Sequence, residues 1–221
     1  IFPDRFASSA PGRAAVKSRP GSLMHAHWNN TPFYIRERES GRIFAYDFFG
    51  GDLAGIAGNL EYLNALGIGA VYLNPIFAAA SNHRYDTADY RNIDPMLGDN
   101  SAFADLCRLA GEKGISIILD GVFSHTGSDS VYFNRESVYP GKGAWQSPES
   151  PYYPWYRFER HPDRYESWWG VDTLPNVNET EPSYLDFIIR DPDSVLRQWL
   201  RLGAKGWRLD VADELPDEFI T

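Results

Sequence analysis

The chain has 221 residues, of which 43% are hydrophobic and 15% aromatic, enough apolar material for one sizeable core. Its 30 acidic and 21 basic side chains give a formal net charge of −9, which disfavours nucleic acid or an anionic membrane as a partner. A single cysteine, Cys107, excludes an intrachain disulfide, and no apolar run approaches the roughly 20 residues of a membrane span. We expect a globular protein located in the cytoplasm. Because the chain begins abruptly on apolar residues, secretion remains an alternative. The sequence also allows a homo-oligomer.

The regular part of the chain repeats one order of elements three times: an amphipathic helix, a glycine that ends it, and a short apolar strand. Apolar residues at spacings of four and three predict the first helix over 53–66. The second helix is expected to begin at Asn100 or Ser101, and the third carries an apolar stripe over 195–200. Glycine is favoured just past a helix end, and the three helices are followed by Gly67, Gly114 and Gly203.

Apolar runs follow these helices. The run at 70–73 predicts a strand buried on both faces, and the runs at 115–119 and 206–209 repeat the pattern. The second and third runs lead directly into Asp120 and Asp210. Helices that alternate with buried strands are typical of a parallel α/β fold, which carries its ligands and catalytic groups at the carboxyl ends of the strands.

A long irregular segment, residues 126–182, interrupts this pattern with seven prolines and twelve aromatic residues. This aromatic density argues against disorder and predicts an inserted domain, most of whose aromatic side chains pack its own small core. We therefore divide the chain into an α/β part at 1–125, the inserted domain at 126–182 and an α/β continuation at 183–221. The α/β residues are too few for a complete eight-unit barrel of about 250 residues, so composition leaves half a barrel or a small open sheet.

The two aspartates at the strand ends are the candidate chemical groups. Arg208 and Asp210 are two residues apart on a strand, so their side chains share a face, and the guanidinium is expected to lower the pKa of Asp210. An ionised Asp210 would suit a nucleophile, although an ordinary ion pair at a strand end has the same spacing. His125 lies beyond the strand of Asp120, and Tyr85 lies in a His-Arg-Tyr-Asp segment; each alone also fits a structural residue.

Together, several spaced motifs resemble the α-amylase family of glycoside hydrolases, in the branch of neopullulanases, cyclomaltodextrinases and related α-glycosidases. The resemblance runs in order along nearly the whole chain, from the first barrel strand to the fourth. The motifs are Phe-Gly-Gly-Asp-Leu at 49–53, Tyr-Leu-Asn-Pro-Ile-Phe at 72–77, His-Arg-Tyr-Asp-Thr-Ala-Asp-Tyr at 83–90, Asp-Gly-Val-Phe-Ser-His at 120–125, Leu-Pro-Asn-Val-Asn at 174–178 and Gly-Trp-Arg-Leu-Asp-Val-Ala-Asp-Glu at 206–214.

The resemblance implies a (β/α)8 TIM barrel, of which this chain supplies about the first four βα units, with the irregular domain inserted after the third strand. It implies a retaining hydrolase of α-glucosidic linkages in starch-derived oligosaccharides. Asp210 would be the nucleophile with Arg208 beside it, Tyr85 would stack under the sugar at the cleavage point, and Asp120 and His125 would contact its hydroxyls.

A retaining glycosidase also needs a protonated carboxylic acid about 5 to 5.5 Å from the nucleophile. In the family this acid follows the fifth strand, and a further histidine and aspartate follow the seventh, all beyond Thr221. Glu214 stands four residues past Asp210, where the family pattern assigns no acid role. We expect the chain to be a fragment of a longer enzyme and to be inactive alone.

The motifs depart from the family pattern where metal ions bind. The resemblance implies no required cofactor, and calcium at two family sites is doubtful. Ser124 replaces a usual asparagine, and Ala7-Ser8-Ser9-Ala10 leaves only the Gly50 carbonyl and Asp52 at the second site. Asp213, in place of a frequent asparagine, weakens a precise subfamily assignment.

Two alternatives belong to other classes. His25-Ala26-His27 has the spacing that places two imidazoles on one face of a strand for a zinc-dependent hydrolase, but 21–24 makes a poor strand and no second histidine cluster follows. A non-catalytic carbohydrate-binding protein could keep the barrel and the sugar contacts without the chemistry. Retention of Asp210 with its charge partner Arg208 argues against it.

Overall fold

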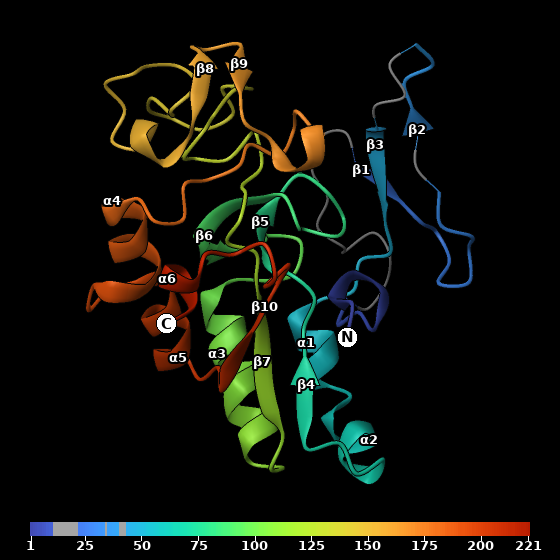
Figure 1. The fold of residues 1–221 in the computed structure, drawn as a ribbon. Coiled ribbons are helices and arrows are strands. Elements are labelled where there is room, and N and C mark those ends of the chain that lie inside the picture. Colours follow the sequence, from blue (N-terminus) through green and yellow to red (C-terminus); the bar gives the residue numbers. More distant parts are fainter. Residues whose placement is uncertain (11–21, 34, 40–42) are drawn as a thin grey trace.

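The computed structural model describes residues 1–10, 22–33, 35–39 and 43–221. Its centre is a parallel sheet in the order β10-β7-β4, formed by β4 (Ala70–Tyr72), β7 (Ser116–Gly121) and β10 (Gly206–Leu209) (Figure 1). These are the three predicted strands. The amino group of Ile1 donates to the Tyr72 carbonyl at 2.7 Å, and the Asn74 amide donates to the Ile1 carbonyl at 2.9 Å. Ile1 therefore extends the parallel sheet beyond β4.

Helices of the chain lie beside this sheet (Figure 1). The long predicted first helix is wrong: two short helices, α1 (Leu53–Ala57) and α2 (Leu60–Ala65), occupy 53–66. Gly58 ends α1 and Asn59 begins α2, and both residues favour helix ends over helix interiors. The second helix, α3 (Asn100–Gly111), is capped by Asp99, whose carboxylate accepts from the Ala102 amide at 2.9 Å, and not by Asn100 or Ser101.

The strands also differ from expectation in their burial and limits. β7 continues through Asp120 to Gly121, so Asp120 lies inside the strand and not after it. β4 and β10 are not buried on both faces, because Ala70 and Arg208 are exposed in this chain. A sheet this narrow cannot close on itself, so the face that would line a barrel interior stays partly open.

Short elements outside the three repeats complete the first part of the chain. β1 (Ser22–Met24) pairs parallel with β3 (Ile43–Phe48), which pairs antiparallel with β2 (Ile35–Arg36), and β5 (Phe77–Ala79) pairs antiparallel with β6 (Thr87–Ile93). A 3-10 turn, η1 (Pro3–Arg5), precedes them. The judgement that 21–24 makes a poor strand is wrong for Ser22–Met24; Gly21 lies outside the described residues.

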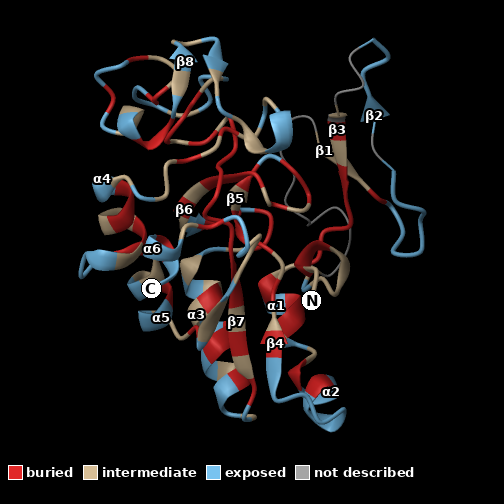
Figure 2. Cartoon of the chain, in the orientation of Figure 1, coloured by how far each residue is buried: buried red, intermediate tan, exposed pale blue. Residues whose placement is uncertain are grey.

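The hydrophobic core lies between the sheet and α3 and α5 (Val195–Arg201) and continues into the inserted segment (Figure 2). Trp199 of α5 is fully buried; its indole packs 5.0 Å from the Phe77 ring and 5.2 Å from the Phe103 ring. The Trp199 indole nitrogen donates to the Tyr90 carbonyl at 2.8 Å, so the ring is buried without an unpaired polar atom. This side chain joins helix α5, helix α3 and strand β6.

Residues after β7 form the segment predicted as an insertion. It contains two 3-10 turns, η3 (Tyr153–Trp155) and η4 (Trp168–Gly170), and a small antiparallel pair, β8 (Phe158–Arg160) and β9 (Arg164–Tyr165). Phe133 is fully buried there, 4.8 Å from the Tyr156 ring and 4.7 Å from the Tyr165 ring, so many of the aromatic side chains pack against one another. The remaining elements are α4 (Pro182–Leu185), the π-helical turn η5 (Asp186–Arg190) and α6 (Asp217–Ile220).

The inserted segment returns to the end of β7. The Thr126 amide donates to the Pro175 carbonyl at 3.1 Å, and the Val177 amide donates to the Ser124 carbonyl at 3.0 Å. These backbone bonds bring the far end of the segment back against the residues that follow Asp120. In the described ranges, no helix has the length and apolar character needed to span a bilayer.

Candidate active site

Arg208 joins the two aspartates predicted from the strand ends. Its Nη1 donates to Asp120 Oδ1 at 3.0 Å and to Asp210 Oδ1 at 2.5 Å. The register explains the arrangement, because Arg208 lies opposite Asp120 in the β10·β7 pair, and the Asp210 amide donates to the Gly121 carbonyl at 3.0 Å. Partial burial acts to lower the pKa of Arg208, but its hydrogen bonds to the two carboxylates outweigh this and raise it. The guanidinium therefore keeps its positive charge between them.

Asp120 is the most enclosed member of this group. Its side chain is 0% exposed, and Oδ2 accepts hydrogen bonds from Tyr85 Oη at 3.0 Å and from Tyr72 Oη. Burial raises the pKa of Asp120, and the bonds from Tyr72 and Arg208 oppose that shift. Both carboxylate oxygens of Asp120 are thus engaged by donors from three sides. In the described residues Asp210 Oδ2 has no hydrogen-bond partner, so one oxygen of Asp210 stays available.

His125 is held against the Tyr85 loop. The imidazole is 2% exposed, with Nε2 3.1 Å from the Tyr85 carbonyl and Nδ1 3.0 Å from Ser124 Oγ. Because a carbonyl only accepts, this bond assigns the proton to Nε2. Burial lowers the pKa of His125, and the nearby Asp210 carboxylate acts in the opposite direction. The structure thus brings all five predicted site residues into one hydrogen-bonded group, with His125 joined through the Tyr85 backbone.

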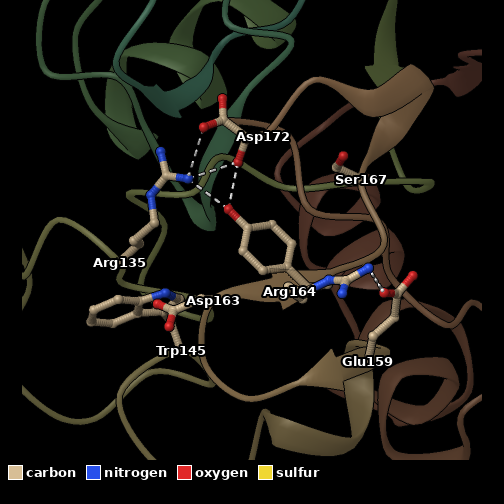
Figure 3. A pocket seen from close by; sticks show the side chains of 8 residues that line it. Arg135, Trp145, Glu159, Asp163, Arg164, Ser167 and Asp172 are labelled. Carbon is tan, nitrogen blue, oxygen red and sulfur yellow. Dashed lines mark hydrogen bonds and ion pairs between the residues drawn. The ribbon is translucent and has the colours of Figure 1, made fainter.

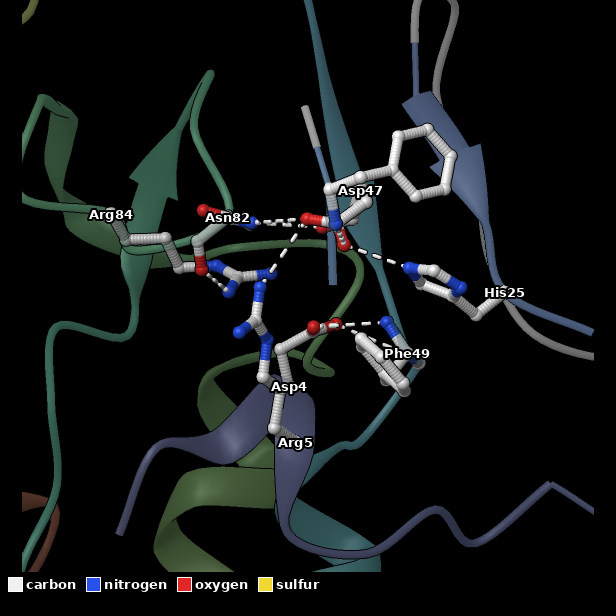
Figure 4. Close-up of polar contacts among 9 residues, drawn as sticks. Asp4, Arg5, His25, Asp47, Phe49, Asn82 and Arg84 are labelled. Atoms are coloured by element: carbon white, nitrogen blue, oxygen red, sulfur yellow. Dashed lines mark hydrogen bonds and ion pairs between the residues drawn. The ribbon is translucent and has the colours of Figure 1, made fainter. Parts of the chain in front are cut away.

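Tyr85 is positioned by the residue before it. Arg84 has a left-handed φ of 61° and is fully buried; its Nε lies 3.2 Å from Asp94 Oδ2, and its Nη1 donates to the Asn82 carbonyl at 2.8 Å. Figure 4 places Arg84 and Asn82 in a polar cluster with residues of η1 and β3 and with His25, which follows β1. Asn82 donates to Asp47 Oδ1 at 3.0 Å. The loop before Tyr85 is therefore anchored in the interior.

Sequence reasoning missed Tyr72. Tyr72 lies on β4 and is paired with Ile118 of β7. Ile118 is two residues before Asp120 on the same strand, so Tyr72 and Asp120 project from the same face of the sheet. Burial raises the pKa of Tyr72 and its hydrogen bond to Asp120 adds to the shift, so the phenol stays protonated as a donor. Period-two alternation in aligned parallel strands is the signal that could have found it.

A separate pocket of about 460 Å³ lies in the inserted segment and contains none of the predicted site residues. Both of its arginines are engaged with neighbouring groups: Arg135 Nη1 donates to Tyr165 Oη at 2.6 Å and lies 3.6 Å from Asp172 Oδ2, and Arg164 pairs with Glu159 at 2.8 Å (Figure 3). The pocket is lined by Arg135, Trp145, Glu159, Asp163, Arg164, Tyr165, Ser167 and Asp172.

The histidine pair proposed for a metal-dependent hydrolase is divided. His25 is buried; its Nε2 lies 2.7 Å from Asp47 Oδ2, and its ring stacks 4.1 Å from the Phe49 ring (Figure 4). His27 is exposed. Across the ranges that the structure describes, no group of three or more His, Cys, Asp or Glu side chains is arranged to hold a metal ion.

The residues at the second family calcium position, where the sequence already made calcium doubtful, do not fit a cation. Asp52 accepts from the Ser9 amide, from Ser9 Oγ at 2.7 Å and from the Gly55 amide at 2.6 Å, so donors surround this carboxylate where a cation would need oxygen acceptors. The turn is tight, since a Cβ on Gly51 would lie 2.1 Å from the Pro3 carbonyl oxygen. Asp52 instead caps α1 and holds the 7–10 loop.

Known proteins resemble this chain over nearly its whole length. The family model for the α-amylase catalytic domain matches residues 1–220. An amylopullulanase of Thermoanaerobacter thermohydrosulfuricus is 42% identical across 99% of this chain and 17% of its own length, and a cyclomaltodextrinase of Geobacillus thermopakistaniensis is 35% identical across 99% and 34%. The solved cyclic α-maltosyl-(1→6)-maltose hydrolase of Arthrobacter globiformis matches with a TM-score of 0.78 and 33% identity, covering 99% of this chain and 45% of that one.

The chain thus spans only 17% and 34% of the length of these two curated relatives. The parallel strands agree with the first units of the TIM barrel expected from the motifs. The predicted resemblance is confirmed: this chain belongs to the α-amylase family of glycoside hydrolases.

Proposed function

We propose that this chain supplies the nucleophile side of the active site of a retaining enzyme that hydrolyses α-glucosidic linkages in starch-derived oligosaccharides. The observation that carries the proposal is Arg208, which bonds both Asp120 and Asp210 beside Tyr85. In this arrangement Asp210 presents an oxygen free of hydrogen bonds from the described residues, and the guanidinium holds positive charge next to its other oxygen.

The proposed chemistry proceeds in two steps. Asp210 Oδ2 attacks the anomeric carbon as the bond to the leaving oxygen breaks, and water then cleaves the glycosyl ester. Asp120, held by Tyr72, Tyr85 and Arg208, would orient the sugar through its hydroxyls, and the Tyr85 ring would stack under it. His125 keeps the Tyr85 loop in place through the Tyr85 carbonyl.

The proton donor is proposed to come from a further part of a longer chain. Glu214 is the nearest glutamate in sequence, but its two oxygens accept from Trp168 Nε1 at 2.9 Å and Trp169 Nε1 at 3.0 Å. Because both of its oxygens already accept indole N–H groups, we do not assign Glu214 the role of the proton donor. On this proposal the 221 residues alone are inactive, and hydrolysis of maltooligosaccharides by the purified chain would contradict it.

No organic cofactor is needed by the family. We further propose that calcium is not required at the Asp52 turn, because Ser9 and Gly55 already occupy the carboxylate with hydrogen-bond donors. Addition of EDTA is expected to leave the melting temperature of the intact protein unchanged.

The test of the proposed nucleophile is Asp210→Asn in the intact enzyme. Turnover of maltooligosaccharides should fall to background, while binding of maltoheptaose measured by titration calorimetry should persist, because the amide keeps the shape of the side chain. Treatment of the wild type with 5-fluoro-α-glucosyl fluoride should add one fluoroglucosyl group to the peptide that contains Asp210. The exposed neighbour Asp213, changed to Asn, is the matched control and should retain activity. Loss of binding together with turnover would instead indicate a structural carboxylate.

A further inference from the structure

Two adjacent tryptophans of the inserted segment donate hydrogen bonds to one carboxylate from the barrel part of the chain. The indole nitrogens of Trp168 and Trp169 donate to Oε2 and Oε1 of Glu214 at 2.9 Å and 3.0 Å. The two rings are stacked, with centroids 5.2 Å apart and planes 23° apart. One carboxylate thus sets the orientation of both rings, because each indole has a single donor that points along its plane.

Trp169 is unusual in exposure and backbone conformation. The residue is 80% exposed, although tryptophan is normally among the more buried residue types. Its backbone lies in the left-handed region, with φ 51° and ψ 28°, which costs a bulky side chain on the order of 1 kcal/mol or more. The described residues therefore leave a large apolar ring uncovered, in an unfavourable backbone conformation, and at a defined angle.

This exposed ring is connected to the candidate active site through contacts between aromatic rings. The Trp168 ring lies 5.2 Å from the His125 ring at 33°, and Trp169 stacks on Trp168. The three rings form a series that starts at the buried His125, which contacts Tyr85, and ends at the exposed Trp169. The Glu214 carboxylate also acts to raise the pKa of His125, so the Trp168, Trp169 and Glu214 group lies near the candidate active site.

We propose that the exposed face of Trp169 is a stacking platform for a glucosyl unit of the α-glucan chain, beyond the unit that is cleaved. The inference rests on the proposed function and extends it to a contact made by the inserted segment. Glu214 is a positioning residue in this site, because it fixes the indole plane.

The chemistry of the platform suits a neutral sugar. A pyranose ring has an apolar C–H face that packs on an indole and a rim of hydroxyls that donate hydrogen bonds. Each Glu214 oxygen accepts one indole N–H and keeps a second lone pair for a hydroxyl. A negative carboxylate beside the ring disfavours anionic polysaccharides. The apolar indole face of Trp169, with the Glu214 carboxylate as an acceptor beside it, is thus complementary to a glucosyl unit.

The test compares a long and a short substrate in the intact enzyme. Trp169→Ala should lower kcat/KM for maltoheptaose by about tenfold, the equivalent of about 1.4 kcal/mol, and should have a much smaller effect on an aryl maltoside too short to reach the platform. Trp169→Phe keeps a ring without the N–H donor and should restore part of the loss. Tyr62→Ala, which removes a 59% exposed ring from α2, is the matched control and should leave both rates unchanged.

Binding in an inactive background provides a readout that does not depend on turnover. In the Asp210→Asn enzyme, adding Trp169→Ala should weaken maltoheptaose binding by about tenfold in titration calorimetry, with an unchanged melting temperature. Equal losses on long and short substrates, or no loss on either, would overturn the platform. A wild type that hydrolyses neither substrate but binds maltoheptaose in a Trp169-dependent way would overturn the proposed hydrolysis and leave the platform standing.

Discussion

The parallel strands and the inserted segment differ in how directly local sequence determines the position of a side chain. In β7 and β10 the strand period places Asp120 and Arg208 opposite each other, and Asp210 follows one residue beyond β10. In the inserted segment Trp168 reaches the site only because the segment returns against the residues after β7. Site residues on a regular scaffold can therefore be located from spacing, whereas those on a long connection depend on contacts between distant residues.

The two regions nevertheless share one hydrophobic core, which contains Trp199 of the barrel and Phe133, Trp155 and Tyr156 of the insertion. A shared core predicts that the two regions unfold together. The aromatic side chains of the inserted segment then report on the stability of the barrel part.

The largest expected effect tests this coupling. Trp199→Ala should lower the free energy of unfolding by about 3 to 5 kcal/mol, because it removes a fully buried ring and leaves a cavity between α5, α3 and β6. Denaturant unfolding followed by far-UV and near-UV circular dichroism should give one shifted transition. Leu200→Ala on the exposed side of the same helix is the control and should shift it little. Two separate transitions would show that the insertion folds as an independent unit.

The next effect concerns the charged group at the carboxyl ends of β7 and β10. Arg208→Lys should lower kcat for maltooligosaccharides by about 10² to 10³-fold, because an ammonium group cannot reproduce the geometry with which one guanidinium serves both Asp120 and Asp210. Steady-state kinetics on the intact enzyme measures the loss. Arg201→Lys, at an exposed arginine of α5 that pairs with Asp193, is the matched control. A rate close to wild type would mean that the planar guanidinium is not needed.

The smallest effect is a pH dependence at the junction of the two regions. Burial lowers the pKa of His125 below its ordinary value of 6.5, so the unfolded chain takes up a proton on falling pH before the native protein does. His125 therefore contributes stability above about pH 6.5 that is lost as the pH falls below it. His125→Gln should show a smaller drop in melting temperature between pH 7.5 and pH 5 than the wild type. An equal drop in both proteins would contradict this contribution.

Helix limits illustrate why local prediction reaches only part of the fold. Apolar spacing marked 53–66 as helical, but Gly58 and Asn59 divide it into α1 and α2. Local capping preference is shared by Asp99, Asn100 and Ser101, and only the structure selects Asp99. The Asn100 side chain instead binds the end of β6: it accepts a hydrogen bond from the Ile93 amide at 3.0 Å and donates one to the Arg91 carbonyl at 2.9 Å.

The amino-acid sequence by itself determined the parallel α/β repeats, because strand and helix periods act over short stretches of chain. The resemblance of its motifs indicated the family and the five residues that meet at the candidate site. The tertiary structure decided that Tyr72 completes the environment of Asp120, that Ser9 occupies the Asp52 turn, and that Trp168 and Trp169 clamp Glu214. Each of these contacts joins residues at least 43 positions apart. Their formation depends on how the chain returns and on packing between distant residues, so spacing within one stretch of chain does not determine them.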